Sequence, residues 1–226
     1  KLILNQHTNI DVEVRKTYNL TKTQIAKRPF CLFISYSGNT EETISVAKDA
    51  IDENLEWAAI SSGGELLDLA TKHNKNFVKV PDGLQPRAAF GLMTKAVVNF
   101  LPNPTKEIFI KACEEAGSYI NNLTEDDSNE VFEISKNIAS QIGTKTAVIY
   151  AGSDLTYLVS RRWKTQINEN SKSKAYVGFM PEVHHNEILS WEADQKGSKN
   201  NFILILLRGD DYKKIDNRFE FTKEVI

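Results

Sequence analysis

Residues 30–43, which read FCLFISYSGNTEET, decide the fold of this chain. The first five residues of the stretch are apolar, and such a short run predicts a strand buried on both faces of a parallel sheet. Gly38 and Asn39 tolerate the tight turn that follows, and from Thr43 onward the apolar spacing is helical. The order strand, loop, helix therefore predicts an α/β fold built on this unit.

The predicted loop carries the hydroxyls of Ser35, Ser37 and Thr40 at the start of a helix. Free backbone N–H groups and the positive end of the helix dipole favour an anion there. No lysine follows in the pattern of a nucleotide-binding P-loop, so the phosphate of a monoester is the better fit. The alternative is that Asn39, with Glu42 three positions later, only caps the helix.

The overall composition is that of a globular protein. The chain has 226 residues, of which 41% are hydrophobic, and a formal net charge of −2. It has neither an apolar run of about 18 residues nor a basic block, so neither a membrane nor a nucleic acid is an expected partner. Cys31 and Cys113 indicate reduced thiols and a cytoplasmic location. Among four histidines only His184 and His185 cluster, so no metal or other cofactor is expected.

Strand and helix patterns alternate along two separate parts of the chain, which predicts parallel βαβ units in both. We expect a first lobe over 1–104, connecting helices over 105–142 and a second lobe over 143–226. Each lobe would be a parallel sheet flanked by helices, doubly wound and flavodoxin-like. The expected strands are the alternating Ile10, Val12 and Val14, then 30–34, 57–60, 77–80, 147–150, 175–179 and 202–207; the expected helices are the end of one at Leu2 to Leu4, then 40–53, 66–70, one just past Pro86, 105–121, 129–142 and 155–168.

Three further stretches carry candidate chemistry. Arg87 would lie in the first turn of the helix after Pro86, where the dipole disfavours a cation, so either a function requires it or it pairs with Asp82. Glu169 is flanked by two asparagines, whose amides could orient a desolvated carboxylate as a general base. The alternative for this triplet is a solvated helix end. The run from His184 to Glu187 is either catalytic or an ordinary turn after a strand.

Taken together, the motifs SYSGNTEET, PRAA, RWKTQINENSK and PEVHHNE resemble, in order, those of the bifunctional phosphoglucose/phosphomannose isomerases of the sugar isomerase (SIS) family. The resemblance covers about residues 10–210. It implies two SIS-type lobes and an aldose–ketose isomerase that interconverts glucose 6-phosphate and mannose 6-phosphate with fructose 6-phosphate through an enediol. It also implies roles for particular residues: Glu169 as the base between C1 and C2, His185 as the ring-opening group, Arg87 beside the enediolate, and Ser35, Ser37 and Thr40 as phosphate ligands.

This chemistry needs a tuned carboxylate, a proton relay and a cation for the oxyanion, but no metal. The resemblance further implies a homodimer with composite sites, in which His185 comes from the neighbouring subunit. It does not extend to the family's glycine-rich N-terminal loop or to its C-terminal segment with a lysine, so the chain is either part of a longer protein or inactive. A non-catalytic phosphosugar-binding SIS module and an isomerase of another phosphosugar are the alternatives.

Overall fold

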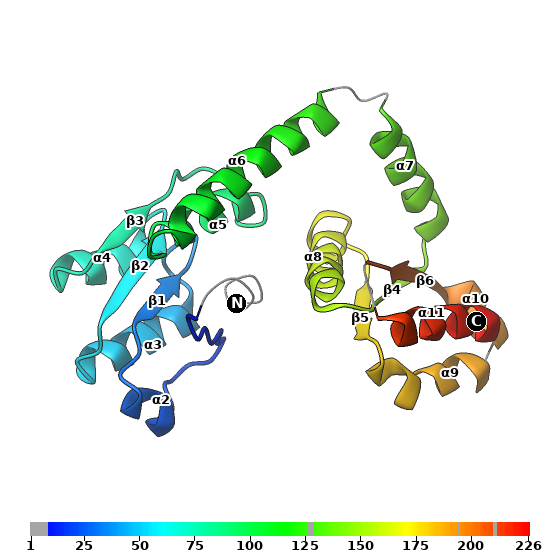
Figure 1. Cartoon of the computed structure of the whole chain (residues 1–226), viewed down its shortest axis with the longest axis horizontal. Coiled ribbons are helices and arrows are strands. Elements are labelled where there is room, and N and C mark those ends of the chain that lie inside the picture. Colours follow the sequence, from blue (N-terminus) through cyan, green and yellow to red (C-terminus); the bar gives the residue numbers. More distant parts are fainter. Residues whose placement is uncertain (1–8, 126–128, 194, 210–211) are drawn as a thin grey trace. The chain divides into compact units, whose positions relative to one another are not determined.

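The computed structural model describes residues 9–125, 129–193, 195–209 and 212–226 (Figure 1). The chain divides into two compact units, one ending at Asn121 and the other beginning at Asn122. Each unit holds a three-stranded sheet in which all strands run parallel. The prediction of two α/β lobes with parallel sheets is confirmed, while the predicted boundaries at 104 and 142 stay a prediction.

The sheet of the first unit has the order β1-β2-β3. Phe33 pairs with Ala59, and Ile60 pairs with Val78. All five residues of β2 are buried, because β2 lies in the middle of the described sheet. The strands are β1 (Cys31–Ile34), β2 (Trp57–Ser61) and β3 (Phe77–Lys79), and the helices are α2 (Lys22–Ala26), α3 (Glu41–Asp52), α4 (Gly64–Lys72), α5 (Phe90–Val98) and α6 (Thr105–Thr124).

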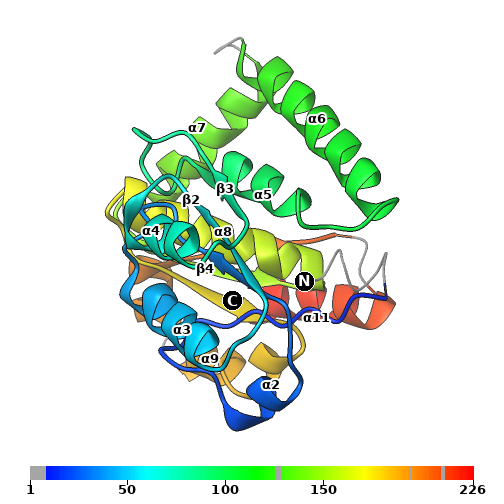
Figure 2. The same ribbon diagram turned by 90° about the vertical axis from the view of Figure 1, so that its left-hand side faces the viewer.

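Helices cover both faces of this first sheet, as Figure 2 lets the reader follow from the side. On one face, α3 and α4 pack their apolar stripes against Phe33, Trp57 and Ala59. On the other face, α5 packs against Ile60 and Val80. The apolar periodicity of α3 and α4 therefore corresponds to a buried stripe, as the sequence predicted.

Two predictions for the first unit are wrong. The predicted strand from Ile10 to Val14 is not among the strands of the described residues: the segment is irregular, and Val14 is 63% exposed. Alternation alone does not make a strand when no neighbour supplies backbone hydrogen bonds. The stretch from Phe30 forms β1, but at the edge of the described sheet, so Ile34 is exposed rather than buried on both faces. The predicted helix end at Leu2 lies outside the described residues.

The second unit has the strand order β5-β4-β6, and its helices again cover both faces. Figure 1 shows α8 on one side of this sheet and α11 on the other. Tyr150, Met180 and Phe219 form the core on the α11 side. The elements are α7 (Glu130–Ile142), β4 (Thr146–Ala151), α8 (Asp154–Asn170), β5 (Ala175–Phe179), the short 3-10 helix η1 (Glu182–His185), α9 (Ile188–Ala193), α10 (Gln195–Asn201), β6 (Phe202–Leu207) and α11 (Lys213–Val225). The predicted strands 175–179 and 202–207 match β5 and β6.

Candidate functional site

The loop between β1 and α3 is held by its own hydroxyl groups. Ser35 Oγ lies 2.7 Å from Thr40 Oγ1 and accepts a hydrogen bond from the backbone N–H of Gly38 at 3.1 Å. Ser37 Oγ accepts from the backbone N–H of Asn39 at 3.3 Å. Ser35 is buried, whereas Ser37 and Thr40 are exposed. The structure therefore brings the three predicted phosphate ligands into one loop, with Ser35 fixing its shape and the other two facing outward.

The capping alternative for Asn39 is wrong. The N-cap of α3 is Thr40, and its side chain makes no capping hydrogen bond. Asn39 Oδ1 instead accepts from the backbone N–H of Glu65 at 3.0 Å, in the first turn of α4. Asn39 thus stabilises the start of the neighbouring helix α4. The start of α3 has no side-chain cap from its own N-cap residue, Thr40. A helix start of this kind is suited to an anion.

The turn after β2 packs directly against this loop, as expected for two strands that end at the same edge of a parallel sheet. The backbone N–H of Ser62 donates to Tyr36 O at 2.9 Å, and that of Leu66 donates to Gly38 O at 2.9 Å. Gly38 has φ +74°, and a Cβ built on it would lie 1.7 Å from Gly63 O. The two turns therefore form one support in which position 38 has to be glycine.

Tyr36 connects this loop to the segment that carries Arg87, a role that the sequence did not suggest. Its hydroxyl donates to Pro81 O at 3.0 Å and accepts from the backbone N–H of Leu84 at 2.9 Å. Arg87 itself is half-buried. The prediction that Arg87 lies in the first turn of a helix is wrong. Pro86 is followed by a turn, and α5 begins only at Phe90.

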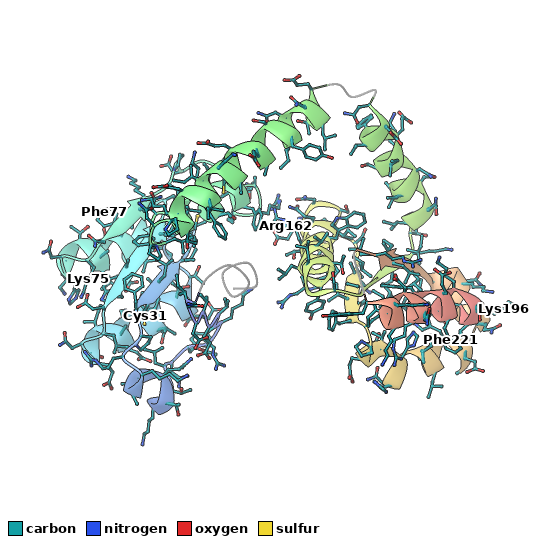
Figure 3. The ribbon with its side chains drawn as sticks, in the orientation of Figure 1. Cys31, Lys75, Phe77, Arg162, Lys196 and Phe221 are labelled. Carbon is teal, nitrogen blue, oxygen red and sulfur yellow. The ribbon has the colours of Figure 1, made fainter. Side chains whose placement is uncertain are left out.

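In the second unit, Glu169 lies one residue before the end of α8. Asn168 Oδ1 accepts from the backbone N–H of Ala175, the first residue of β5, at 3.0 Å. The amide of Asn170 contacts the amide of Gln166, so the two asparagines that flank Glu169 have partners on β5 and on α8. Glu169 is exposed, so the predicted desolvation is absent from this single chain. Arg162, labelled in Figure 3, lies on the same helix.

His185 ends η1, which follows the opposite end of β5. The turn around it is anchored to the core through Glu187: Tyr150 donates its hydroxyl hydrogen to Glu187 Oε2 at 3.1 Å and accepts from Trp191 Nε1 at 2.8 Å. Burial is the main cause that raises the pKa of the Tyr150 hydroxyl. His185 is exposed, while Val183 two residues earlier is buried.

Among the described residues, the start of α8 and the two cysteines have structural roles or no partners that suggest a site. Ser153 N-caps α8 through a capping box with Thr156, so the turn of Gly152 and Ser153 is the start of that helix. Cys31 and Cys113 are free thiols. Over the described ranges, no group of His, Cys, Asp and Glu is arranged to hold a metal ion. None of the helices described here has the length and apolar character required to traverse a bilayer.

Comparisons with known proteins define the class. Residues 133–226 match the family described as bacterial phospho-glucose isomerase C-terminal SIS domain. The fold is similar to the C-terminal domain of glucosamine-fructose-6-phosphate aminotransferase from Francisella tularensis (TM-score 0.62, 17% identity, 87% of this chain and 55% of that one). It is also similar to glucosamine-6-phosphate deaminase from Thermotoga maritima (TM-score 0.57, 14% identity, 88% and 59%). Residues 133–226 are thus similar to an SIS domain, and the fold of the chain is similar to those of these two solved structures.

In sequence, the chain is a homologue of the bifunctional phosphoglucose/phosphomannose isomerases. It is 36% identical to the one from Aquifex aeolicus over 198 residues. These residues make up 87% of this chain and 58% of the relative. The enzyme of that name from Thermoplasma acidophilum is 37% identical over 194 residues, 85% of this chain and 57% of the relative. D-glucosamine-6-phosphate 4-epimerase from Sulfolobus acidocaldarius is 30% identical, over 89% and 61%. The chain thus spans about three fifths of the length of these relatives.

Proposed function

We propose that this chain is the SIS portion of an aldose–ketose isomerase that interconverts glucose 6-phosphate and mannose 6-phosphate with fructose 6-phosphate. The observation that carries the proposal is the identity of 36–37% to bifunctional phosphoglucose/phosphomannose isomerases over 85–87% of the chain. The loop of Ser35, Ser37 and Thr40 supports it, because a phosphate monoester is an anion suited to the start of α3.

The proposed reaction moves a proton between C1 and C2 of the open-chain sugar. Glu169 takes the proton from one carbon and returns it to the other, and His185 opens the ring by proton transfer at the ring oxygen. Arg87 stabilises the negative charge that develops on the enediolate oxygen. Ser37 and Thr40 bind the phosphate, with Ser35 holding Thr40 in place.

The enzyme is proposed to be a homodimer with composite sites. Asn168, next to Glu169, is bonded to the first residue of β5, whereas the turn with His185 follows the last residue of the same strand. The first and last of the five residues of β5 are about 13 Å apart. The ring oxygen and C1 are bonded neighbours in a glucose ring, so a base and a ring-opening group on one substrate must lie close together. Glu169 and His185 of one chain do not meet this condition, and His185 of a second copy supplies the missing group.

An isomerase of another phosphosugar is the second candidate, since the 4-epimerase from Sulfolobus acidocaldarius is 30% identical. Coupled assays of the full-length gene product with fructose 6-phosphate, glucose 6-phosphate, mannose 6-phosphate and glucosamine 6-phosphate separate the candidates. Conversion of the first three supports the proposal. Turnover of the aminosugar alone favours the second candidate, and binding of all four without turnover indicates a phosphosugar-binding module.

A further inference from the structure

His184, the residue before His185, lies outside the motif that resembles the isomerases, yet its side chain is fully engaged. Its Nε2 lies 2.7 Å from Thr222 Oγ1, and its Nδ1 lies 3.3 Å from Nη1 of Arg218. Its ring also packs edge-on against Phe221, with 5.7 Å between the ring centroids. All three partners are on α11, and Phe221 is labelled there in Figure 3. The imidazole therefore connects the η1 turn to a helix 34–38 residues away in the sequence.

The directions of these hydrogen bonds determine the state of the ring. The Thr222 hydroxyl donates its single hydrogen to Arg218 O at 2.8 Å, so toward His184 it can only accept. Nε2 of His184 must then carry a hydrogen. Arg218 can only donate, so Nδ1 must be the acceptor and carries none. The contacts thus select the neutral imidazole with its hydrogen on Nε2.

Helix α11, which binds the side chain of His184, is itself packed into the core of the second unit. Thr222 and Phe219 are fully buried, and Phe219 belongs to the core of the second unit. On the other side of His184 in the sequence, Val183 is buried in the same core. Two consecutive residues of η1 are therefore fixed, one by the core and one by α11. The direction of the next side chain, the exposed His185, follows from this fixation.

We propose that His184 is a positioning residue: its imidazole, held between Arg218 and Thr222 of α11, fixes the turn that presents His185 for ring opening. The proposal rests on the proposed isomerase function for its catalytic consequence. It does not make His184 a catalytic residue, because both ring nitrogens already have partners within the chain. The alternative is a packing histidine whose loss affects stability alone.

The charges around the ring are consistent with this role. Among the residues that the structure describes, the charged or titratable groups beside His184 are Arg218 and Lys214 of α11 and His185 of η1, and all of them are basic. Partial burial, Arg218 and His185 together lower the pKa of His184. A proton on Nδ1 would place two donors face to face and add a further positive charge beside Arg218. Neutral pH therefore keeps the connection to α11 intact.

The test uses a matched pair at Thr222 in the full-length gene product. Thr222→Val has nearly the same shape but removes the acceptor, and Thr222→Ser keeps it. We expect Thr222→Val to lower the kcat for fructose 6-phosphate on the order of 10-fold to 100-fold through displacement of His185, with the Michaelis constant nearly unchanged. Thr222→Ser should restore kcat to within about twofold of the unaltered protein.

Two readouts do not depend on isomerase activity. Long-range proton–nitrogen NMR should show His184 as the Nε2–H tautomer, and Thr222→Val should change the ring signals of His185 while Thr222→Ser leaves them in place. An active enzyme whose kcat survives Thr222→Val, or an Nδ1–H tautomer of His184, overturns the positioning role while the isomerase function stands. If the unaltered protein isomerises no phosphosugar but the NMR results hold, the proposed function fails instead, and with it the catalytic consequence claimed for His184.

Discussion

Glu169 and His185 lie at opposite ends of strand β5, Glu169 near its amino end and His185 beyond its carboxyl end. The link from Asn168 to Ala175 ties the end of α8 to the start of β5, and η1 with His185 follows the end of that strand. In a parallel sheet, the end of a crossover helix lies near the start of the next strand. A residue at the end of the helix, such as Glu169, is therefore separated by the length of that strand from a residue that follows it, such as His185. Two residues that are close in sequence and belong to one predicted reaction are thus far apart within one chain.

Mixing two inactive variants should therefore restore activity. Glu169→Gln removes the base and His185→Ala removes the ring-opening group, and each alone should lower turnover by about 10²-fold or more. In a two-fold assembly the heterodimer has one site with both defects and one with neither. Unfolding and refolding the variants together should then recover about a quarter of the unaltered activity, since half of random pairs are mixed. A verified heterodimer without recovery would show that each chain uses its own His185.

Substitutions in the phosphate loop should act on binding rather than on turnover. Ser37→Ala and Thr40→Val each remove an exposed hydroxyl from the start of α3. Each should raise the Michaelis constant for the phosphosugar by about 10-fold or more, the loss of a hydrogen bond to a charged group of roughly 1.5–3 kcal/mol. Thr40→Ser keeps the hydroxyl and is the matched control. A fall in thermal stability with unchanged binding would mean that these hydroxyls serve the loop alone.

Gly38→Ala should destabilise the first unit. The left-handed backbone at φ +74° costs a residue with a Cβ about 1–2 kcal/mol, and the clash with Gly63 O adds to this. The variant should show a lower unfolding midpoint in urea and weaker phosphosugar binding, because both turns must shift. Gly91→Ala is the control: Gly91 lies inside α5 with open space around it, so the same change should leave stability equal or raise it by up to about 1 kcal/mol. Equal midpoints for the two variants would contradict the close packing of the turns.

Tyr150→Phe should destabilise the second unit by about 1–3 kcal/mol, because the buried N–H of Trp191 loses its acceptor and Glu187 loses a donor. Urea unfolding measures the change. Tyr176→Phe removes a hydroxyl from a side chain that is 57% exposed and should have little effect on stability. If the two substitutions cost the same, the Tyr150 hydroxyl does not anchor the turn that carries His185.

The stability of the second unit should depend on pH through His184. Its pKa in the folded chain is lowered from 6.5, so as the pH falls below 6.5 the unfolded chain takes up a proton that the folded chain resists. The free energy of unfolding therefore decreases between pH 6.5 and the lower folded value, and this contribution is constant below that value. Unfolding of the unaltered protein and of His184→Asn, compared from pH 5 to pH 7.5, should show the larger decrease in the unaltered protein. Parallel curves would contradict a neutral His184 in the folded chain.

The sequence by itself determined the two α/β units, since apolar runs and helical spacing report on local burial. Strands β5 and β6 and helix α8 follow from such patterns, and the loop after β1 was recognisable from its small hydroxyl residues beside a glycine. The motif order also identified the candidate residues Ser35, Ser37, Thr40, Glu169 and His185. These features are local, so a short window of sequence contains the physical information that specifies them.

Only the tertiary structure decided which partners these residues have. The alternation from Ile10 to Val14 predicted a strand, but the described segment is irregular. Asn39 was, as one alternative, expected to cap its own helix, but it accepts a hydrogen bond from Glu65 of the next helix. His184 and Thr222 are 38 residues apart in the sequence. The direction of the hydrogen bond between them depends on the hydroxyl of Thr222, which lies in a helix that the sequence analysis did not predict. Hydrogen bonds between distant segments depend on how the chain packs in three dimensions, because sequence spacing does not specify which donors and acceptors meet.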